Sequence, residues 1–264
     1  MNLSAIIAAR HRVTAAALLL DTYTGAAVAY SLRDLTSSWT SSDVVLVRRS
    51  SDDAESGFTA TEVSDGTMLT WVGTGGTDNG FVTTWYDQSG NANNAVQATT
   101  TLQPKVVSAG ALVVGGLDFD NSNDFLNITV TLAQPFSIFT AYKALSNTSP
   151  VTGKITGSGA GGVITRLSTG AYTMFAGTVL SAGTHSSTEV LASCIFNGAT
   201  STGHWNSVSI LSGDPGAGAS IDAIGRQGSD YMDGTVKELI IYNTNESSNR
   251  VGIETNINAA YSIY

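Results

Sequence analysis

The feature that most constrains this chain is the regular alternation of short apolar runs with turn-forming residues. From Val44 onward, runs rich in Val, Ile, Thr, Phe and Tyr are separated by Gly, Asn, Asp or Ser. Among these runs are VVLVRR, FVTTWYD, GALVVGGLDFD, DFLNITVTL, PFSIFTAYKAL, EVLASCIF, HWNSVSI, SIDAIGR and GTVKELIIYN. Such runs are typical of strands joined by tight turns. Many short strands with little helix predict an all-β sandwich or barrel.

The two ends of the chain show a different pattern. Residues 1–35 are rich in Ala and Leu and carry a loose helical stripe interrupted at Gly25, which predicts an N-terminal helical arm. Residues 36–264 form the predicted β-sandwich domain, because no long linker divides them. Near the C-terminus, Ser247 or Ser248 is a suitable N-cap for a short helix. Its apolar stripe consists of Ile253, Ile257, Ala260 and Tyr261.

Charge and cysteine content exclude several classes of protein. Charged residues make up only 12% of the 264 residues, and the formal net charge is −9, so the sequence has no basic face to neutralise phosphate groups. We therefore expect neither nucleic acid nor an anionic membrane surface as a partner. Cys194, the single cysteine, cannot form an intrachain disulfide and is typical of a buried small apolar residue.

The N-terminal apolar run has some features of a targeting segment. It extends from Val13 to Leu20 after two arginines, but DTYTG follows it in place of a small-residue cleavage site. We therefore expect no signal peptide. No apolar segment reaches the length of a membrane span, so membrane insertion is not predicted.

The stretch TTWYDQSGNANNAV (Thr83–Val96) raises the question of what Asp87 does. One interpretation is an Asx-type turn, in which the Asp87 carboxylate accepts N–H groups of the following residues and Gly90 supplies a positive φ. The other is catalysis, because two carboxylates cleave glycosidic bonds. Glu189 and Glu238 are the candidates for a second carboxylate, and both lie in apolar strands.

Aromatic residues give the same stretch a binding interpretation. Trp85, Tyr86 and Asp87 are predicted carbohydrate contacts, together with Trp205, because aromatic faces stack on sugar rings. Strand alternation places one of Trp85 and Tyr86 inside the fold and the other outside.

The acidic turn, residues 118–124 (DFDNSND), is the candidate metal site. Asp118, Asp120, Asn123 and Asp124 offer hard oxygen ligands that suit Ca²⁺. The turn lacks the Gly and the distant Glu of an EF-hand loop. The alternative is a polar hairpin connection with no metal.

The second half of the chain resembles a known fold. DFDNSNDFLNITVTL followed by PFSIFTAYKA is similar to the opening strands of concanavalin A-like, laminin G-like jelly rolls. IGRQGSDYMDGTVKELIIYN, with the terminal helix, resembles the closing hairpin of that family, and HWNSVSI takes the place of another hairpin. This resemblance covers residues 110–264 and implies a jelly-roll β-sandwich.

The first half resembles a narrower group. AAVAYSLRDL, VVLVRRSSDDAE and TTWYDQSGNANNAV are similar to the N-terminal half of the arabinofuranosidase B catalytic domain, glycoside hydrolase family 54. Phage virion proteins carry the same block, and the chain looks closest to those. The fungal enzymes are rich in cysteine, and their catalytic Glu and Asp lie in segments without a match here. No catalytic residue is carried over from the resemblance.

Two functions follow as expectations. The first is a phage virion structural protein, such as a decoration, fibre or spike subunit, that assembles with other virion proteins and with copies of itself and contacts surface polysaccharide. The alternative is a glycoside hydrolase or carbohydrate-binding module similar to arabinofuranosidase B. The first would be located in the virion and would work by burying surface between subunits without catalysis.

Overall fold

The computed structural model describes residues 17–145, 149–153, 163–166, 170–218 and 220–264. These parts are mostly β-strand, which confirms the predicted β-sandwich. The strands of the first half are β1 (Ala26–Ser31), β2 (Asp43–Arg49), β3 (Glu55–Thr59), β4 (Gly80–Trp85), β5 (Ala95–Val96), β6 (Lys105–Ser108), β7 (Ala111–Leu112), β8 (Leu117–Asp120), β9 (Leu126–Thr131) and β10 (Phe136–Ala144).

The second half of the chain supplies the remaining strands and the terminal helix. The strands are β11 (Ser149–Pro150), β12 (Thr152–Gly153), β13 (Val163–Arg166), β14 (Tyr172–Phe175), β15 (Val179–Ala182), β16 (Glu189–Phe196), β17 (Ser201–Trp205), β18 (Val208–Gly213), β19 (Ser220–Ile224), β20 (Arg226–Gln227), β21 (Asp230–Tyr231) and β22 (Asp233–Tyr242). The helices are α1 (Leu19–Thr22), α2 (Ala60–Ser64), α3 (Thr67–Val72) and α4 (Arg250–Tyr261), with a 3-10 turn at Thr100–Leu102.

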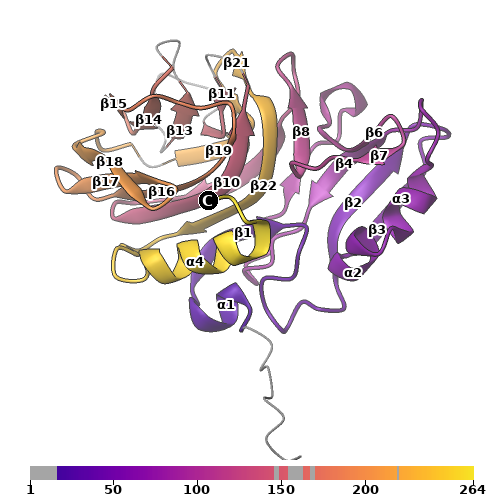
Figure 1. Ribbon diagram of the computed structural model, residues 1–264, viewed down its shortest axis with the longest axis horizontal. Coiled ribbons are helices and arrows are strands. Elements are labelled where there is room, and N and C mark those ends of the chain that lie inside the picture. The colour runs from indigo at the N-terminus through magenta and orange to yellow at the C-terminus, as the bar shows by residue number, and fades with distance from the viewer. Residues whose placement is uncertain (1–16, 146–148, 154–162, 167–169, 219) are drawn as a thin grey trace, which may run out of the picture.

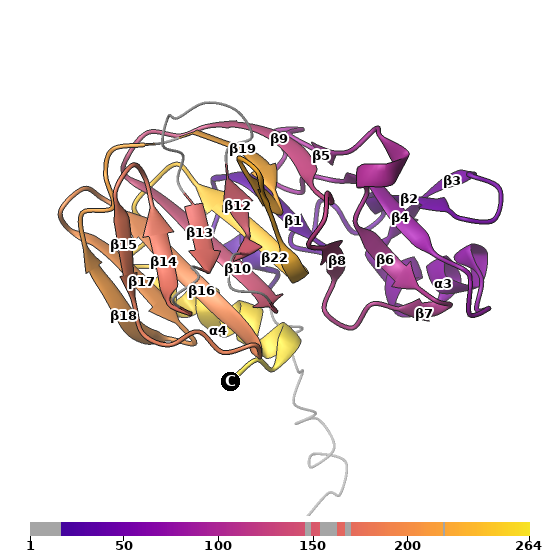
Figure 2. The same cartoon turned by 90° about the horizontal axis from the view of Figure 1, so that it is seen from above.

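One large antiparallel sheet organises the fold. Its central strand β22 pairs with β10, β8 and β1, and β10 continues through β16 and β17 to β18. A smaller sheet, β11-β13-β14-β15, lies beside the β16–β18 end, and β2–β7 with α2 and α3 form the opposite end (Figures 1 and 2). The large sheet has a buried apolar cluster on each of its faces.

Alternation along β22 divides the core into two parts. Leu239 and Ile241 point into the main core between the sheets, which also contains Trp85. Ile240 and Tyr242 point to the opposite face, where α1 and α4 pack below the sheet (Figure 1). Successive side chains of a strand point to opposite faces, so a strand buried on both faces is apolar throughout.

The described part of the predicted N-terminal helical segment is mostly not helical. One short helix, α1, precedes Gly25, whose φ is +85°, and Ala26–Ser31 then forms β1 against β22. Nearly every residue of β1 is buried. Its side chains are buried on both faces of the sheet, so the strand shows no alternation of apolar and polar residues. Residues 1–16 of the predicted arm lie outside the described residues.

The predicted C-terminal helix is confirmed as α4, but its cap differs. The N-cap residue is Asn249, which makes no side-chain capping bond, in place of Ser247 or Ser248. Ile253 and Ile257 are buried against the sheet, and each burial contributes about 1.5–3 kcal/mol. In the parts of the chain that the structure describes, no helix is both long and apolar enough to cross a membrane.

Candidate functional site

Asp87 organises the turn after β4. Its Oδ1 accepts the N–H groups of Ala29 at 2.9 Å and Ser89 at 3.0 Å. Its Oδ2 accepts the Ser89 hydroxyl at 2.8 Å and the Asn93 N–H at 3.0 Å. The side chain is fully buried. These four bonds confirm the turn interpretation, because they occupy both carboxylate oxygens with protein donors.

The residues around Asp87 join the same turn to β1. Gln88 Oε1 accepts the Leu35 N–H at 2.8 Å, and Gln88 Nε2 donates to the carbonyls of Ser31 and Arg33. Gly90 has the predicted positive φ, and Ala92 is the other residue of the turn with one. The turn therefore fixes β1 against β4.

Three of the four predicted carbohydrate contacts are core residues. Trp85 is fully buried beside Tyr30, with ring centroids 5.7 Å apart, and Asp87 is buried in its turn. Trp205 is stacked on Tyr172 with centroids 4.6 Å apart. Their burial gives the prediction no support, because a buried ring presents no face to a ligand, and carbohydrate contact by these residues stays a prediction. Tyr86 is half-exposed, in agreement with the expected alternation.

The predicted partner carboxylates also have structural contacts. Glu238 is fully buried under α4 and binds Arg33, Ser31 and Tyr261. Glu189 forms an ion pair with Lys237. The Asp87 carboxylate bonds Ala29, Ser89 and Asn93, so the contacts of the three carboxylates do not join them into a pair.

The acidic turn (residues 118–124) brings several carboxyl groups together at the end of β8. Asp120 is exposed, and its Oδ1 accepts the N–H groups of Ser122 at 2.9 Å and Asn123 at 3.2 Å. Asp118 is half-buried on the same side of the strand, as predicted, and Asp124 is buried. The Asn121 N–H donates to the Met232 carbonyl at 2.9 Å, which joins the acidic turn to the β20–β21 hairpin.

Burial and charge distinguish these carboxyl groups from one another. Burial, together with the neighbouring Asp120 and Asp118 charges, raises the pKa of Asp124 to about 7, against the opposing effects of a backbone hydrogen bond from Asp120 and of Lys105. Burial also raises the pKa of Asp118. Near neutral pH, Asp124 thus holds a transferable proton beside the exposed Asp120. When two carboxyl groups lie in different environments, one can act as an acid and the other as a base or nucleophile.

A cation packed over two adjoining aromatic rings flanks the acidic turn. The Arg226 guanidinium carbon lies 4.9 Å from the Phe125 ring centroid and 5.1 Å from that of Tyr231. Arg226 and Tyr231 are both half-exposed. These residues were missed from the sequence, since Arg226 and Phe125 are far apart along the chain. They provide ring surface and hydrogen-bond donors next to the carboxyl groups.

The predicted Ca²⁺ site gains no support from the side-chain arrangement. Within the described residues, no group of three or more His, Cys, Asp or Glu side chains is placed to hold a metal ion. Asp120 instead bonds the backbone of its own turn, as in a polar hairpin connection. Calcium binding by Asp118, Asp120, Asn123 and Asp124 stays a prediction.

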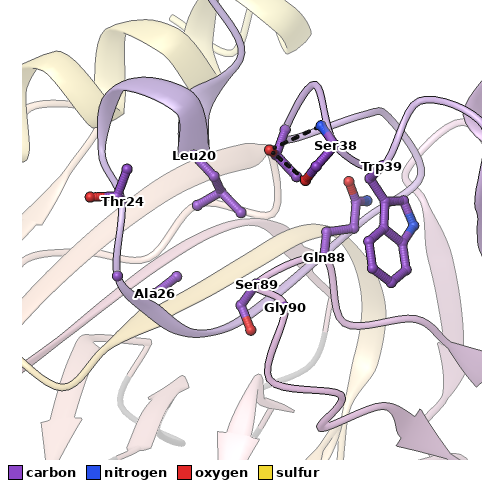
Figure 3. Close-up of a pocket in the computed structure, with 10 residues that line it drawn as sticks. Leu20, Thr24, Ala26, Ser38, Trp39, Gln88, Ser89 and Gly90 are labelled. Carbon is purple, nitrogen blue, oxygen red and sulfur yellow. Dashed lines mark hydrogen bonds between the residues drawn. The ribbon is translucent and has the colours of Figure 1, made fainter.

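A cavity of about 350 Å³ lies beside the residues that follow Asp87 in its turn. Gln88, Ser89 and Gly90 line it from the turn, Leu20 from α1, and Trp39 from the loop before β2 (Figure 3). The TTWYDQSG stretch therefore borders a cavity through the residues that follow Asp87.

Comparison with known proteins supports the fold. No protein-family profile matches the chain, and no curated protein matches it. Two solved structures are similar over 92% of this chain: an arabinofuranosidase complexed with arabinofuranosyl-α-1,2-xylobiose (TM-score 0.59) and a GH54 α-L-arabinofuranosidase soaked with a cyclic sulfate inhibitor (TM-score 0.60). Both are 16% identical to it, and this chain spans 64% of each of them. The likeness shows that this chain shares the β-sandwich fold of these two structures.

Proposed function

We propose that this chain acts on carbohydrate and hydrolyses arabinofuranosyl groups at the acidic turn. The observation that carries the proposal is the pairing of buried Asp124, whose pKa is raised to about 7, with the exposed carboxylate of Asp120. Similarity in fold to arabinofuranosidases supports the choice of sugar. The virion interpretation receives no comparable support from solved structures.

The two carboxyl groups have separate roles in this proposal. Asp124 donates its proton to the oxygen of the departing sugar, which lowers the barrier to breaking the glycosidic bond. Asp120 is the partner carboxyl group that attacks the anomeric carbon or activates water. Arg226 and Tyr231 lie beside them and hold the substrate through hydrogen bonds and ring contacts.

Hydrolysis of 4-nitrophenyl α-L-arabinofuranoside and of arabinoxylan tests the proposal. Asp124→Asn and Asp120→Asn should each lower kcat/KM about 10²-fold or more. Wild-type activity should fall as pH rises through about 7, because Asp124 loses its proton. Asp214→Asn is the matched control: Asp214 is exposed, and an amide oxygen can still accept the Gly216 N–H.

Two results would contradict parts of this proposal. Full activity in both acidic-turn variants would exclude these residues from catalysis. Binding of arabinoxylan without turnover by the wild-type chain would exclude hydrolysis and leave a carbohydrate-binding module.

A second proposal is assembly into a virion with other virion proteins and copies of this chain. It rests on the sequence block shared with phage virion proteins, AAVAYSLRDL through TTWYDQSGNANNAV. Mass spectrometry of gradient-purified particles from the source culture tests it. A fixed copy number per particle would support the assignment, and detection only in the free fraction would oppose it.

A further inference from the structure

The cavity beside the Asp87 turn has the chemistry of a site for a neutral ligand. Of the ten described residues that line it, none carries a charged side chain. Hydroxyl groups, one amide, one indole and the Leu20 side chain make up its surface. A phosphate, a nucleotide or a metal ion would find no counter-charge or ligand set there.

The walls of the cavity combine an apolar ring with hydroxyl groups. Figure 3 shows Leu20 and Trp39 on opposite sides, with Ser38 between them and with Ser89 and Gly90 on the far edge. Trp39 is half-buried, and its Nε1 donates to the Asp43 carbonyl at 3.0 Å. This bond fixes the indole. A fixed aromatic face beside hydroxyl groups is suited to a sugar ring, which has apolar C–H faces and a polar edge.

The floor of the cavity is held by hydrogen bonds, whereas its rim is exposed and the Ser38 hydroxyl there bonds that of Thr36 at 3.1 Å. The Gln88 amide uses its oxygen and nitrogen on backbone groups, and the Ser89 hydroxyl donates to Asp87. At the rim, Thr24 and Ser38 are exposed. The cavity is therefore shaped before a ligand arrives, and a rigid site loses less entropy when it binds.

We propose that this cavity binds one unit of a neutral sugar, with the ring face against Trp39 and the sugar hydroxyl groups toward Thr24 and Ser38. The cavity volume of about 350 Å³ is at the small end of the range for ligand sites. Helix α1 and the β20–β21 hairpin lie at opposite ends of the molecule (Figure 1), so the cavity is separate from the acidic turn. It would hold carbohydrate without cleaving it.

The test is a titration of the ¹⁵N-labelled full chain with arabinose, xylose, galactose and xylobiose, followed by NMR. The chain has four tryptophans, so the spectrum contains four indole N–H signals, and Trp39→Phe assigns that of Trp39. We expect saturable shifts of the Trp39 indole and of the Ser89 and Gly90 amides with at least one of these sugars. Trp39→Ala should weaken binding about tenfold or more.

Thr24→Phe tests the site without disturbing the core. Thr24 is exposed at the rim, so a phenyl group there should fill the cavity and abolish the shifts while the melting temperature stays unchanged. Asp124→Asn is the control for the proposed catalytic site and should leave these shifts intact even if it abolishes hydrolysis. A failure of hydrolysis thus remains distinguishable from a failure of this proposal.

Three outcomes would overturn the inference. The first is the absence of saturable shifts with all four neutral sugars. The second is sugar-induced shifts that leave the Trp39 indole unmoved. The third is binding that Thr24→Phe does not weaken.

Discussion

Arg33 and Glu238 form a buried ion pair between the segment after β1 and the central strand β22. Arg33 Nε donates to Glu238 Oε2 at 2.8 Å, and a second guanidinium nitrogen donates to Oε1 at 3.0 Å. The Glu238 side chain is fully buried, whereas that of Arg33 is 24% exposed. Ser31 and Tyr261 also donate to the same carboxylate. One acidic group thus joins β1, β22 and α4.

Removing the cation should destabilise the fold strongly. Arg33→Met leaves the Glu238 charge buried with two hydroxyl donors only, and we expect the free energy of unfolding to fall by about 3 kcal/mol. Urea denaturation measures this change. Asp52→Asn is the control: it breaks the exposed Arg49–Asp52 pair and should have a much smaller effect. Equal losses in the two variants would show that burial adds nothing to the Arg33–Glu238 pair.

Asp87 should behave as a structural residue. In Asp87→Asn, an amide nitrogen replaces one carboxylate oxygen. Because that nitrogen cannot accept a hydrogen bond, a buried donor that now bonds the carboxylate is left unpaired. We expect the free energy of unfolding to fall by about 2 kcal/mol, measured by thermal and urea unfolding. An unchanged stability accompanied by loss of hydrolysis would instead indicate a catalytic Asp87.

Asp124 should make stability depend on pH. The carboxyl group has an ordinary pKa of 3.8 in the unfolded chain and about 7 in the fold, so the folded state binds more protons between these values. Its contribution is therefore fully present below about pH 4 and is lost as pH rises through about 7. The loss is at most about 1.4 kcal/mol per pH unit.

The comparison with Asp124→Asn isolates this effect. The amide does not titrate and can still accept the backbone N–H of Asp120. The variant should gain stability relative to the wild type as the pH rises, as measured by urea unfolding at a series of pH values. Parallel pH profiles for the two proteins would contradict the raised pKa of Asp124.

Cys194 should be inert in the native state. The thiol is fully buried in β16, and burial raises its pKa, so little thiolate is available for reaction. We expect no reaction with DTNB in buffer and one thiol per chain in denaturant, because the sequence contains one cysteine. Rapid native labelling would show that β16 opens locally.

Strands rich in β-branched and aromatic residues were predictable from the sequence even where both faces are buried, whereas the Ala-rich strand β1 and the short helix α2 were not. Composition and flanking turn residues indicated β4, β9, β10 and β22. Strand β1 was mistaken for a helix because Ala-rich residues buried on both faces show no period of two. Helix α2 was missed although Thr59 and Glu62 form a capping box, which is a recognisable local pattern.

The candidate sites depended more on tertiary structure. The turn role of Asp87 follows from local chemistry, since Asp before Ser and Gly favours an Asx turn. The burial of Trp205 does not, because the Tyr172 ring on which it stacks comes from a distant strand. The raised pKa of Asp124 does not either, because its largest cause is burial, which exists only after folding. Trp39 and Gln88 likewise meet at the cavity only after folding.

The four hydrogen bonds accepted by Asp87 have a consequence for how this sequence block is interpreted in other chains. The carboxylate accepts backbone N–H groups of β1 and of its own turn. The residues TTWYDQSG therefore specify how β1 is held against the turn that follows β4. A chain that carries this block should share that local architecture whatever reaction it performs. The block is therefore a marker of shared scaffold geometry, and the chemistry of each such chain has to be read from the residues at its own acidic turn and cavities.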